Sequence, residues 1–406
     1  MLRSEGRILC THAGSLIRPP ELRSFLELQH AGTPYDEEAF ESCLRDSVGE
    51  VVRRQLEAGL DVVDDGEFGK PILWNSYINE RLSGVERDLE GPPGEFPPTN
   101  DARLFPEFWA EYLGSQGYDP QETRGYVCTG PISYTGHAAM QRDIDNLLAA
   151  GAPNAFLPVV APASVSGIRW ETVYASEEEF LYAVADALRE EYKLILDAGL
   201  FLQVDDAFIP WMYDIMVPPG TLDDYRAWAR SRVEILNHAL RDLPAERIRY
   251  HICWGSFNAP HVGDVGAEHV LDIVLGVNAS YFLVEMANPR HEHEWRLWED
   301  LKLPESKVLV PGVISHATNV VEHPRLVAER LVRLAHLVGR ENVMGGTDCG
   351  FAQGPFIQRV HPTIMWAKLE SLAEGARLAS DELWGAGAGG LPQGRAVTFG
   401  RLSPQN

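Results

Sequence analysis

The amino-acid sequence predicts an α/β protein whose fold is a (β/α)8 TIM barrel with an insertion after strand two. Short apolar runs alternate with longer stretches of helical periodicity, which is typical of βα units around a parallel sheet. The sequence contains eight strand candidates, which favours a (β/α)8 barrel over an open doubly wound sheet. These candidates are Ile8–Thr11, Val62–Asp64, Tyr126–Cys128, Phe201–Val204, Tyr250–Cys253, Tyr281–Val284, Val308–Val313 and Val343–Gly346. No G-x-G-x-x-G motif follows a strand and no G-x-x-x-x-G-K-[ST] motif occurs, so the main signatures of a nucleotide-binding sheet are missing.

Several helices between the predicted strands have recognisable ends. Ser176 and Glu179 have the spacing of a capping box, and Gly199 follows the helix that this box opens. Pro324 and Gly339 mark the start and the end of another helix. The helices with the clearest amphipathic pattern or end signals cover residues 38–58, 180–198 and 325–338.

Two segments break this alternation within a single catalytic barrel over residues 1–383. Residues 85–125 are rich in proline, glycine and acidic residues, but they contain more aromatic residues than a disordered linker would. We therefore expect an ordered insertion, and its role as a lid, an oligomer contact or a surface flap stays open. Residues 384–406 form a low-complexity, glycine-rich tail.

Composition excludes several classes of partner. The chain of 406 residues is 45% hydrophobic and is long enough for one large barrel. Its net charge of -24 argues against nucleic acid or an anionic membrane surface, because both require basic patches. No signal-peptide pattern and no apolar run of roughly 20 residues occurs. The five scattered cysteines are typical of a reducing compartment, so we expect a cytoplasmic protein whose thiols serve metal binding or catalysis.

Polar residues gather at the predicted carboxyl ends of the strands, where the catalytic groups of a parallel barrel stand. They are His12 and Ser15 after strand one, Asp64, Asp65 and Glu67 after strand two, Asp205 and Asp206 after strand four, His251 and Cys253 at strand five, Glu285 after strand six, Ser315 and His316 after strand seven, and Asp348 and Cys349 after strand eight. So many ionisable groups at one edge would be costly to bury unless they form a site.

Three of these residues have the chemistry of a metal site. His251 and Cys253 are two residues apart in a predicted strand, so their side chains share one face. Cys349, from another strand, completes a His/Cys/Cys set that suits a borderline metal, and zinc is the usual occupant. Three protein ligands leave one coordination position open, which distinguishes a catalytic zinc from a structural one.

Other interpretations stay open for several candidates. Glu67, Asp205 and Asp206 also fit strand-end caps of helix N-termini, and His316 also fits a hydrogen-bonded loop histidine. The His-Glu-His-Glu run over 291–294 resembles a metal tract, but a solvated helix face is the favoured interpretation. We interpret the remaining cysteines as packing residues and three aromatic residues as pocket walls; they are Cys10, Cys43 and Cys128, and Trp211, Tyr213 and Trp254.

The motifs at these strand ends resemble those of the cobalamin-independent methionine synthase family, which includes epoxyalkane:coenzyme M transferase-like members. The resemblance covers roughly residues 7–380 and corresponds only to the carboxy-terminal catalytic barrel of the full-length methionine synthases. It rests on the segments 11–16, 62–67, 202–205, 251–253, Glu285 and 347–350.

The resemblance implies a zinc ion on His251, Cys253 and Cys349, with Glu285 as the fourth, exchangeable ligand. A free thiol is mostly protonated at neutral pH, and its thiolate is the nucleophile. Zinc ionises a thiol that binds in the open position and fixes its location. We therefore expect the thiolate of a small thiol to attack an alkyl carbon.

The resemblance also implies roles for the surrounding residues. Ser15, Glu67 and Asp205 match positions where the methionine synthases hold the amino and carboxyl ends of homocysteine, and His316 lies near the family's proton-handling histidine. The predicted catalytic residues are therefore His316, Glu67 and Asp205, and the predicted substrate-binding residues are His12, Ser15, Glu67, Asp205 and Trp254.

One segment departs from the family pattern. After Thr129-Gly130-Pro131 the methionine synthases place a tryptophan that contacts the folate ring, and the matching stretch 132–137 contains none. The sequence therefore leaves the alkyl donor open.

We predict a zinc-dependent thiol alkyltransferase that transfers a methyl or alkyl group to a small thiol. One alternative is epoxide opening by a thiol, as in the epoxyalkane:coenzyme M transferases. Another is a barrel with a structural zinc that only binds a small thiol. The expected partners are the thiol acceptor and a small alkyl donor, without nucleic acid or membrane, and a homo-oligomer stays open.

Overall fold

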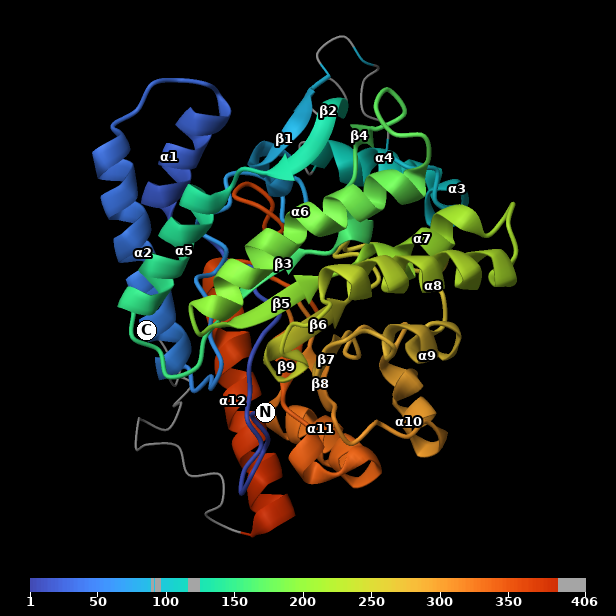
Figure 1. Cartoon of the computed structure of the whole chain (residues 1–406). Helices are drawn as coiled ribbons and strands as arrows, with labels where there is room; N and C mark the ends of the chain where they lie inside the picture. Colours follow the sequence, from blue (N-terminus) through green and yellow to red (C-terminus); the bar gives the residue numbers. More distant parts are fainter. Residues whose placement is uncertain (89–90, 92–95, 116–124, 386–406) are drawn as a thin grey trace.

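The computed structural model describes residues 1–88, 91, 96–115 and 125–385 of the chain. Its centre is a curled, six-stranded parallel sheet with helices packed around it (Figure 1). The order of the strands is β3-β5-β6-β7-β8-β9. Their bounds are β3 Phe156–Val160, β5 Phe201–Asp205, β6 Ile248–Ile252, β7 Tyr281–Val284, β8 Val308–Ile314 and β9 Gly346–Thr347. The mixed α/β class and the parallel sheet that the sequence predicts are therefore confirmed.

The first two predicted strands are present only as isolated parallel bridges. Cys10 bridges Gly345 beside β9, and Val63 bridges Ala155 beside β3. The backbone N–H of Asp61 donates to the carbonyl of Cys10 over 2.8 Å. Residues 9–11 and 61–63 thus lie between the two edge strands of the sheet.

The third predicted strand is assigned to the wrong segment. Tyr126–Cys128 belongs to β2 (Tyr126–Tyr134), which forms a separate three-stranded sheet with β1 (Leu82–Arg87) and β4 (Ile168–Arg169). The strand next to β5 is β3 instead, and all five of its residues are buried. Pro158 explains the error, because a proline inside an apolar run argues against a strand.

The predicted helices are confirmed to within a few residues. The hydroxyl of Ser176 accepts the N–H of Glu179 at the start of α6, and Val184, Leu188 and Ile195 lie fully buried along one face of this helix. α11 and α12 pack on each other and against β8. The α-helices are α1 Pro20–His30, α2 Glu37–Glu57, α3 Asn100–Leu104, α4 Pro106–Ser115, α5 His137–Ala149, α6 Glu177–Asp197, α7 Phe208–Met216, α8 Leu222–Ala239, α9 Leu271–Val274, α10 Leu297–Asp300, α11 Pro324–Val338 and α12 Pro362–Trp384. Short 3-10 helices cover Tyr77–Arg81, Pro162–Ser164, Ala245–Arg247, Ala267–His269, Glu292–Arg296 and Arg340–Asn342.

The described part of the predicted insertion is ordered, as expected, and packs against the loop after β6. Asp101 at the start of α3 accepts the backbone N–H groups of His261 and Val262, each over 2.8 Å. The ring of Trp109 on α4 packs edge-on against Phe257 with centroids 5.5 Å apart. The stretches 89–90, 92–95 and 116–124, and the tail from 386 to 406, lie outside the described residues.

Two further observations bear on the cysteines and on membranes. All five cysteines are free thiols. Within the described part of the chain, no helix combines the length and the apolar character that crossing a bilayer requires.

Candidate metal centre

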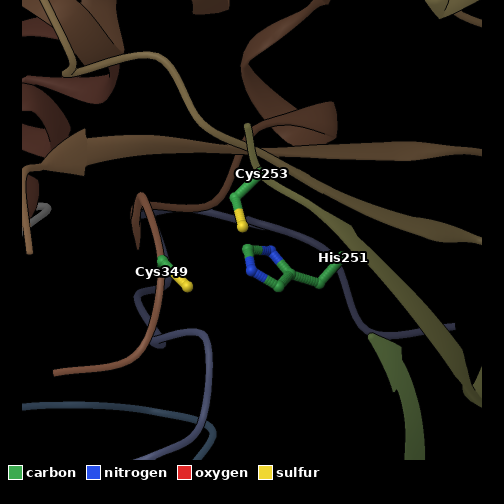
Figure 2. Close-up of side chains that lie close together, drawn as sticks. All are labelled: His251, Cys253 and Cys349. Atoms are coloured by element: carbon green, nitrogen blue, oxygen red, sulfur yellow. The ribbon is translucent and has the colours of Figure 1, made fainter. Parts of the chain in front are cut away.

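Three predicted ligands meet at the carboxyl end of the sheet. His251 lies on β6, Cys253 directly follows that strand, and Cys349 follows β9 (Figure 2). One ring nitrogen of His251 and the two sulfur atoms all lie within 4.8 Å of one another. His251 and Cys253 share a face of the strand because they are two residues apart. Among the residues that the structure describes, this is the one group of three such side chains found close enough to hold a metal ion.

The hydrogen bonding of His251 fits a metal ligand. Its ring is 4% exposed and, apart from the contact with the Cys349 thiol that raises its pKa, neither ring nitrogen has a hydrogen-bond partner within residues 1–88, 91, 96–115 and 125–385. A buried polar atom without a partner is costly, and coordination of a metal removes that cost. The donor set of one imidazole and two thiols is the one that zinc prefers.

The two thiols differ in how easily they ionise. Contact with the Cys253 thiol, helped by His251 and His316, outweighs burial and holds the pKa of Cys349 well below its usual value. Contact with Cys349 and burial raise the pKa of Cys253 well above its usual value. Of the two thiols, Cys349 therefore ionises more easily than Cys253.

Glu285, the fourth predicted ligand, lies next to the three but outside the group that meets within 4.8 Å. It follows β7 and is 1% exposed. One carboxylate oxygen accepts the backbone N–H of Trp254 over 3.0 Å, and the other accepts the side-chain amide of Asn288 over 2.9 Å. These two bonds hold Glu285 in a fixed orientation beside the three residues.

A cavity of about 200 Å³ opens onto the three residues. Ser15, Glu67 and Asp205 line it, as the sequence analysis predicts for residues that hold a substrate. The hydroxyl oxygen of Ser15 is buried and has no hydrogen-bond partner in the described chain. Much of the remaining wall is aromatic; it includes Trp74, Phe208, Trp211 and Phe257.

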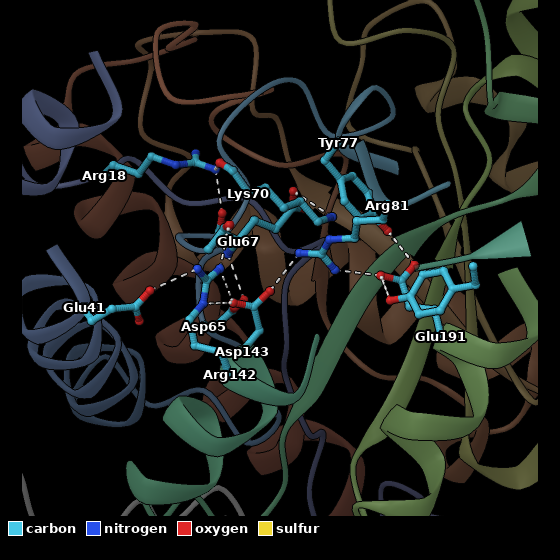
Figure 3. Close-up of polar contacts among 12 residues, drawn as sticks. Arg18, Glu41, Asp65, Glu67, Lys70, Tyr77, Arg81, Arg142, Asp143 and Glu191 are labelled. Atoms are coloured by element: carbon cyan, nitrogen blue, oxygen red, sulfur yellow. Dashed lines mark hydrogen bonds and ion pairs between the residues drawn. The ribbon is translucent and has the colours of Figure 1, made fainter. Parts of the chain in front are cut away.

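Glu67 is held in a strained and charged setting. Its φ of 61° lies in the left-handed region, which residues other than glycine rarely adopt. One carboxylate oxygen lies 3.1 Å from Nζ of Lys70, and both side chains are buried (Figure 3). Arg18 donates to the backbone carbonyl of Glu67. The fold thus fixes this carboxylate at the cavity wall rather than leaving it as a simple helix cap.

Asp205 ends β5 and faces the same cavity. The side-chain amide of Gln203 donates to it over 2.9 Å. Burial raises the pKa of Asp205 to about 7, against the lowering effect of His251. Its neighbour Asp206 instead accepts the hydroxyls of Ser164 and Tyr250 over 2.8 and 2.9 Å. Asp206 therefore links structural elements, and it does not line the cavity.

His316 follows β8 and is 2% exposed. Neither of its ring nitrogens has a hydrogen-bond partner among the described residues. Burial lowers its pKa, although the charges of Cys349 and Glu285 act in the opposite direction. The imidazole of His316 is therefore neutral at neutral pH. It lies close enough to Cys349 and Glu285 for their charges to affect its pKa.

Two predicted substrate-binding residues do not line the cavity. His12 points its Nε2 at the side-chain oxygen of Gln55 over 2.7 Å, and burial lowers its pKa to about 4. The indole N–H of Trp254 donates to the carbonyl of Val265 over 2.7 Å. Tyr213, expected as a pocket wall, is also absent from the lining, whereas Trp211 is part of it.

The run over 291–294 corrects an expectation of the sequence analysis. His291 and Glu294 are buried, at 3% and 8% exposure, whereas His293 is exposed. The prediction that this run forms a solvated helix face is therefore wrong for His291 and Glu294. Its 3-10 geometry over Glu292–Arg296 places the first and fourth residues on one side, which the sequence did not indicate.

Some cavity residues carry no sequence motif. Trp74, Asn75, Phe208, Phe257 and Gln353 line the cavity although they lie in loops or at a helix start. Their position near predicted strand ends was the only available signal.

Arg359 is a further residue near the site that the sequence analysis did not single out. Its guanidinium donates to the hydroxyl oxygen of Tyr112 in the insertion over 2.8 Å. A second guanidinium nitrogen lies 3.4 Å from the hydroxyl of Ser256, which lines the cavity. Burial lowers the pKa of Arg359, and the charges of Cys349 and Cys253 are among the groups that oppose this.

The amino-acid sequence of the chain is similar to those of several known proteins. No protein-family model matches the chain. It is 24% identical to the uncharacterized protein YxjH of Bacillus subtilis, over 89% of this chain and 92% of that protein. It is 23% identical to the methionine synthase of Saccharolobus solfataricus, over 92% and 95% of the two chains. A 5-methyltetrahydropteroyltriglutamate–homocysteine methyltransferase of Thermotoga petrophila is 22% identical over 84% of this chain, which spans only 41% of that protein.

Solved structures show the same fold. A B12-independent methionine synthase from Shewanella superposes with a TM-score of 0.69 at 20% identity, covering 93% of this chain and 99% of that chain. A Listeria monocytogenes protein described as a putative vitamin-B12 independent methionine synthase gives a TM-score of 0.62 at 19% identity, over 91% and 98%.

The fold and the site together define an α/β protein with a His/Cys/Cys centre at the carboxyl edge of a parallel sheet. Its named relatives are methionine synthases, and the predicted resemblance to the cobalamin-independent methionine synthases is confirmed.

Proposed function

We propose that this protein is a zinc-dependent methyltransferase that transfers a methyl group to the sulfur of a small amino-acid thiol such as homocysteine. The single observation that carries the proposal is the meeting of His251, Cys253 and Cys349 at the wall of a cavity. The names of two relatives, a homocysteine methyltransferase and a methionine synthase, support the choice of reaction.

We also propose that the sheet closes into a (β/α)8 barrel over residues 1–383, followed by a tail from 384 to 406. The backbone bonds of residues 9–11 and 61–63 bridge the gap between β9 and β3, which supports eight positions around the barrel. Residues 85–125 are then an insertion after strand two.

His251, Cys253 and Cys349 would hold zinc, with Glu285 as a fourth ligand that yields to the substrate. Bound there, zinc would stabilise the acceptor as a thiolate and fix its position. The buried carboxylate of Glu285 is close enough to the three residues to affect the pKa of His251 and of Cys253.

The cavity wall favours an acceptor with an ammonium group. Glu67 and Asp205 present two carboxylates, and Ser15 offers a buried hydroxyl for a carboxylate of the same substrate. A thiol that carries only a sulfonate would bring a second negative charge next to Asp205, whereas Glu67 is already paired with Lys70. This favours an amino-acid thiol over the coenzyme M alternative.

Transfer forms a bond between the acceptor sulfur and the methyl carbon and breaks the bond between that carbon and the donor. The electron pair of the broken bond stays with the donor, which then takes up a proton. His316 is neutral, and its ring nitrogens have no hydrogen-bond partner among the described residues. It would accept the proton of the thiol on a ring nitrogen and pass it to the methyl donor. The aromatic walls would limit the access of water to the reacting atoms.

Metal analysis combined with cobalt substitution tests the proposal. We expect about one zinc ion per chain and a cobalt(II) spectrum that changes when homocysteine is added. A structural metal site would give a spectrum that no thiol alters. Full methyl transfer by metal-stripped protein would overturn the proposal.

A further inference from the structure

A second buried cluster joins the loop after β6 to the segment after β7. It consists of His261, Asp264, His291 and Glu294, which we call the paired-histidine network. The side chains are between 3% and 9% exposed. Half of the network comes from the run over 291–294, for which the proposed reaction provides no role.

The two imidazoles share one carboxylate oxygen. Oδ2 of Asp264 lies 2.8 Å from Nδ1 of His261 and 2.9 Å from Nε2 of His291. The other nitrogen of His291 lies 2.9 Å from a carboxylate oxygen of Glu294, and Nε2 of His261 lies 3.0 Å from the carbonyl of Phe257.

This hydrogen bonding determines the charge of both rings. Carboxylate and carbonyl oxygens have no hydrogen to donate, so every ring nitrogen of the pair must carry one. His261 and His291 are therefore imidazolium cations between two carboxylates. Burial lowers the pKa of each, but Asp264 and the other carboxylates outweigh it and raise the pKa to about 9 for His261 and about 10 for His291.

The network contacts the metal centre through Trp254. The ring of His291 stacks on the indole of Trp254 with centroids 4.2 Å apart and an interplanar angle of 27°. A cation over an indole face is attracted by the ring quadrupole. Trp254 directly follows Cys253, and its backbone N–H donates to Glu285.

The same network fixes the loop from 253 to 265, which forms part of the cavity wall. His261 binds the carbonyl of Phe257, a lining residue, and has a φ of 57° in the left-handed region. Asp101 of the insertion accepts the backbone N–H of His261 from the other side. Such strain persists only where surrounding contacts impose it, so the loop is held on both sides.

We propose that the paired-histidine network is a positioning device for Glu285: the imidazolium of His291 fixes Trp254, whose backbone N–H sets the orientation of the Glu285 carboxylate beside the metal site. His261, Asp264 and Glu294 fix His291 and its loop. The inference rests on the proposed function, because it gives Glu285 the role of an exchangeable ligand. A network with only a structural role would affect stability and leave Glu285 unchanged.

The test compares His291→Gln with the matched control His293→Gln. His293 belongs to the same run but is exposed, so its substitution leaves the network intact. The probe is cobalt(II) bound to the full-length chain without added thiol. The sulfur-to-metal charge-transfer band reports Cys253 and Cys349, and the ligand-field bands report the coordination number and geometry of the whole site.

We expect His291→Gln to retain the charge-transfer band, to change the ligand-field bands and to raise the zinc dissociation constant by about 10- to 100-fold. His293→Gln should match the wild type in all three. Unchanged ligand-field bands and zinc affinity in folded His291→Gln would overturn the inference. A wild-type protein without the charge-transfer band would instead overturn the proposed metal centre itself.

A second variant covers the case in which His291→Gln does not fold. Glu294→Gln keeps the shape of the side chain and the contact between His291 and Asp264, but removes one negative charge from the network. It should shift the ligand-field bands in the same direction, by less. No shift in this variant would contradict the inference.

Discussion

Two buried histidines whose pKa values are both raised by the charge of Glu285 have opposite environments. His251 is 4% exposed and, apart from the Cys349 thiol, has no hydrogen-bond partner in the described chain, whereas His291 is 3% exposed and has a carboxylate at each nitrogen. The first ring is available to a metal, and the second cannot leave its partners without exposing buried charges. The comparison shows that the residue type alone does not identify a ligand; an unsatisfied ring nitrogen that lies close to other donor atoms, as in His251, is also required.

Removing a thiol beside His251 should have the largest effect. Cys349→Ser is expected to reduce bound zinc to near zero and methyl transfer by about 1000-fold, or roughly 4 kcal/mol, because a serine hydroxyl is a poor zinc ligand. Metal content and initial rates on the folded variant measure this. Cys43→Ser, on the remote helix α2, is the control and should behave as wild type. A Cys349→Ser protein with normal zinc content would place the metal elsewhere.

His316 tests whether a second histidine with unpartnered nitrogens acts chemically without holding the metal. We expect His316→Gln to retain zinc and to lose about 100-fold in turnover, because general acid–base groups contribute on this scale. Initial-rate assays at saturating acceptor measure the turnover, and metal analysis measures the zinc content. If the variant loses zinc in parallel with activity, His316 belongs with His251 as a ligand.

Asp205 tests the side of the cavity that binds the acceptor. Asp205→Asn should raise the KM for homocysteine by about 10- to 100-fold, the loss expected for a hydrogen bond to a charged group. It should change the KM for 4-mercaptobutyrate, which lacks the amino group, far less. Asp206→Asn is the control, since Asp206 binds Ser164 and Tyr250 rather than the cavity. Equal effects on both thiols would argue against an ammonium subsite.

Much of the sheet was predictable from sequence because buried parallel strands are short, continuous apolar runs. The runs that became β7 and β8 have this form, whereas β5 and β6 also contain polar residues; all residues of the four strands but Phe201 are buried. β3 was missed because Pro158 interrupts an otherwise apolar run. β2 was assigned to the barrel because its first residues have strand character, and only tertiary pairing places them in a second sheet.

The candidate site was predictable where the chemistry depends on spacing. His251 and Cys253 had to share a face, and strand ends had to bring Cys349 near them. The two bonds that hold Glu285 were not predictable, because they come from Trp254 and Asn288 in separate loops. Nor was the burial of His291, which depends on a 3-10 turn and on the docking of that turn against the loop after β6.

The smallest expected effect is the pH dependence of stability that the paired-histidine network produces. The pKa of His291 is about 10 and that of His261 about 9, both above the value of about 6.5 in an unfolded chain. The groups that face His291 are Asp264, Glu294 and Glu285, and His261 also faces His316.

Because the folded state binds the extra protons, this stabilisation is fully present below about pH 6.5 and is lost as pH rises through the folded pKa values. Between about pH 6.5 and 9, the free energy of unfolding should fall more steeply in wild type than in His291→Gln, by roughly 1 kcal/mol per pH unit. Urea unfolding of both proteins across this range measures the difference, in which the shared titrations cancel. If the two plots of unfolding free energy against pH are parallel, His291 carries no extra proton in the folded protein. His291 and His251 would then differ in their hydrogen bonding but not in their charge.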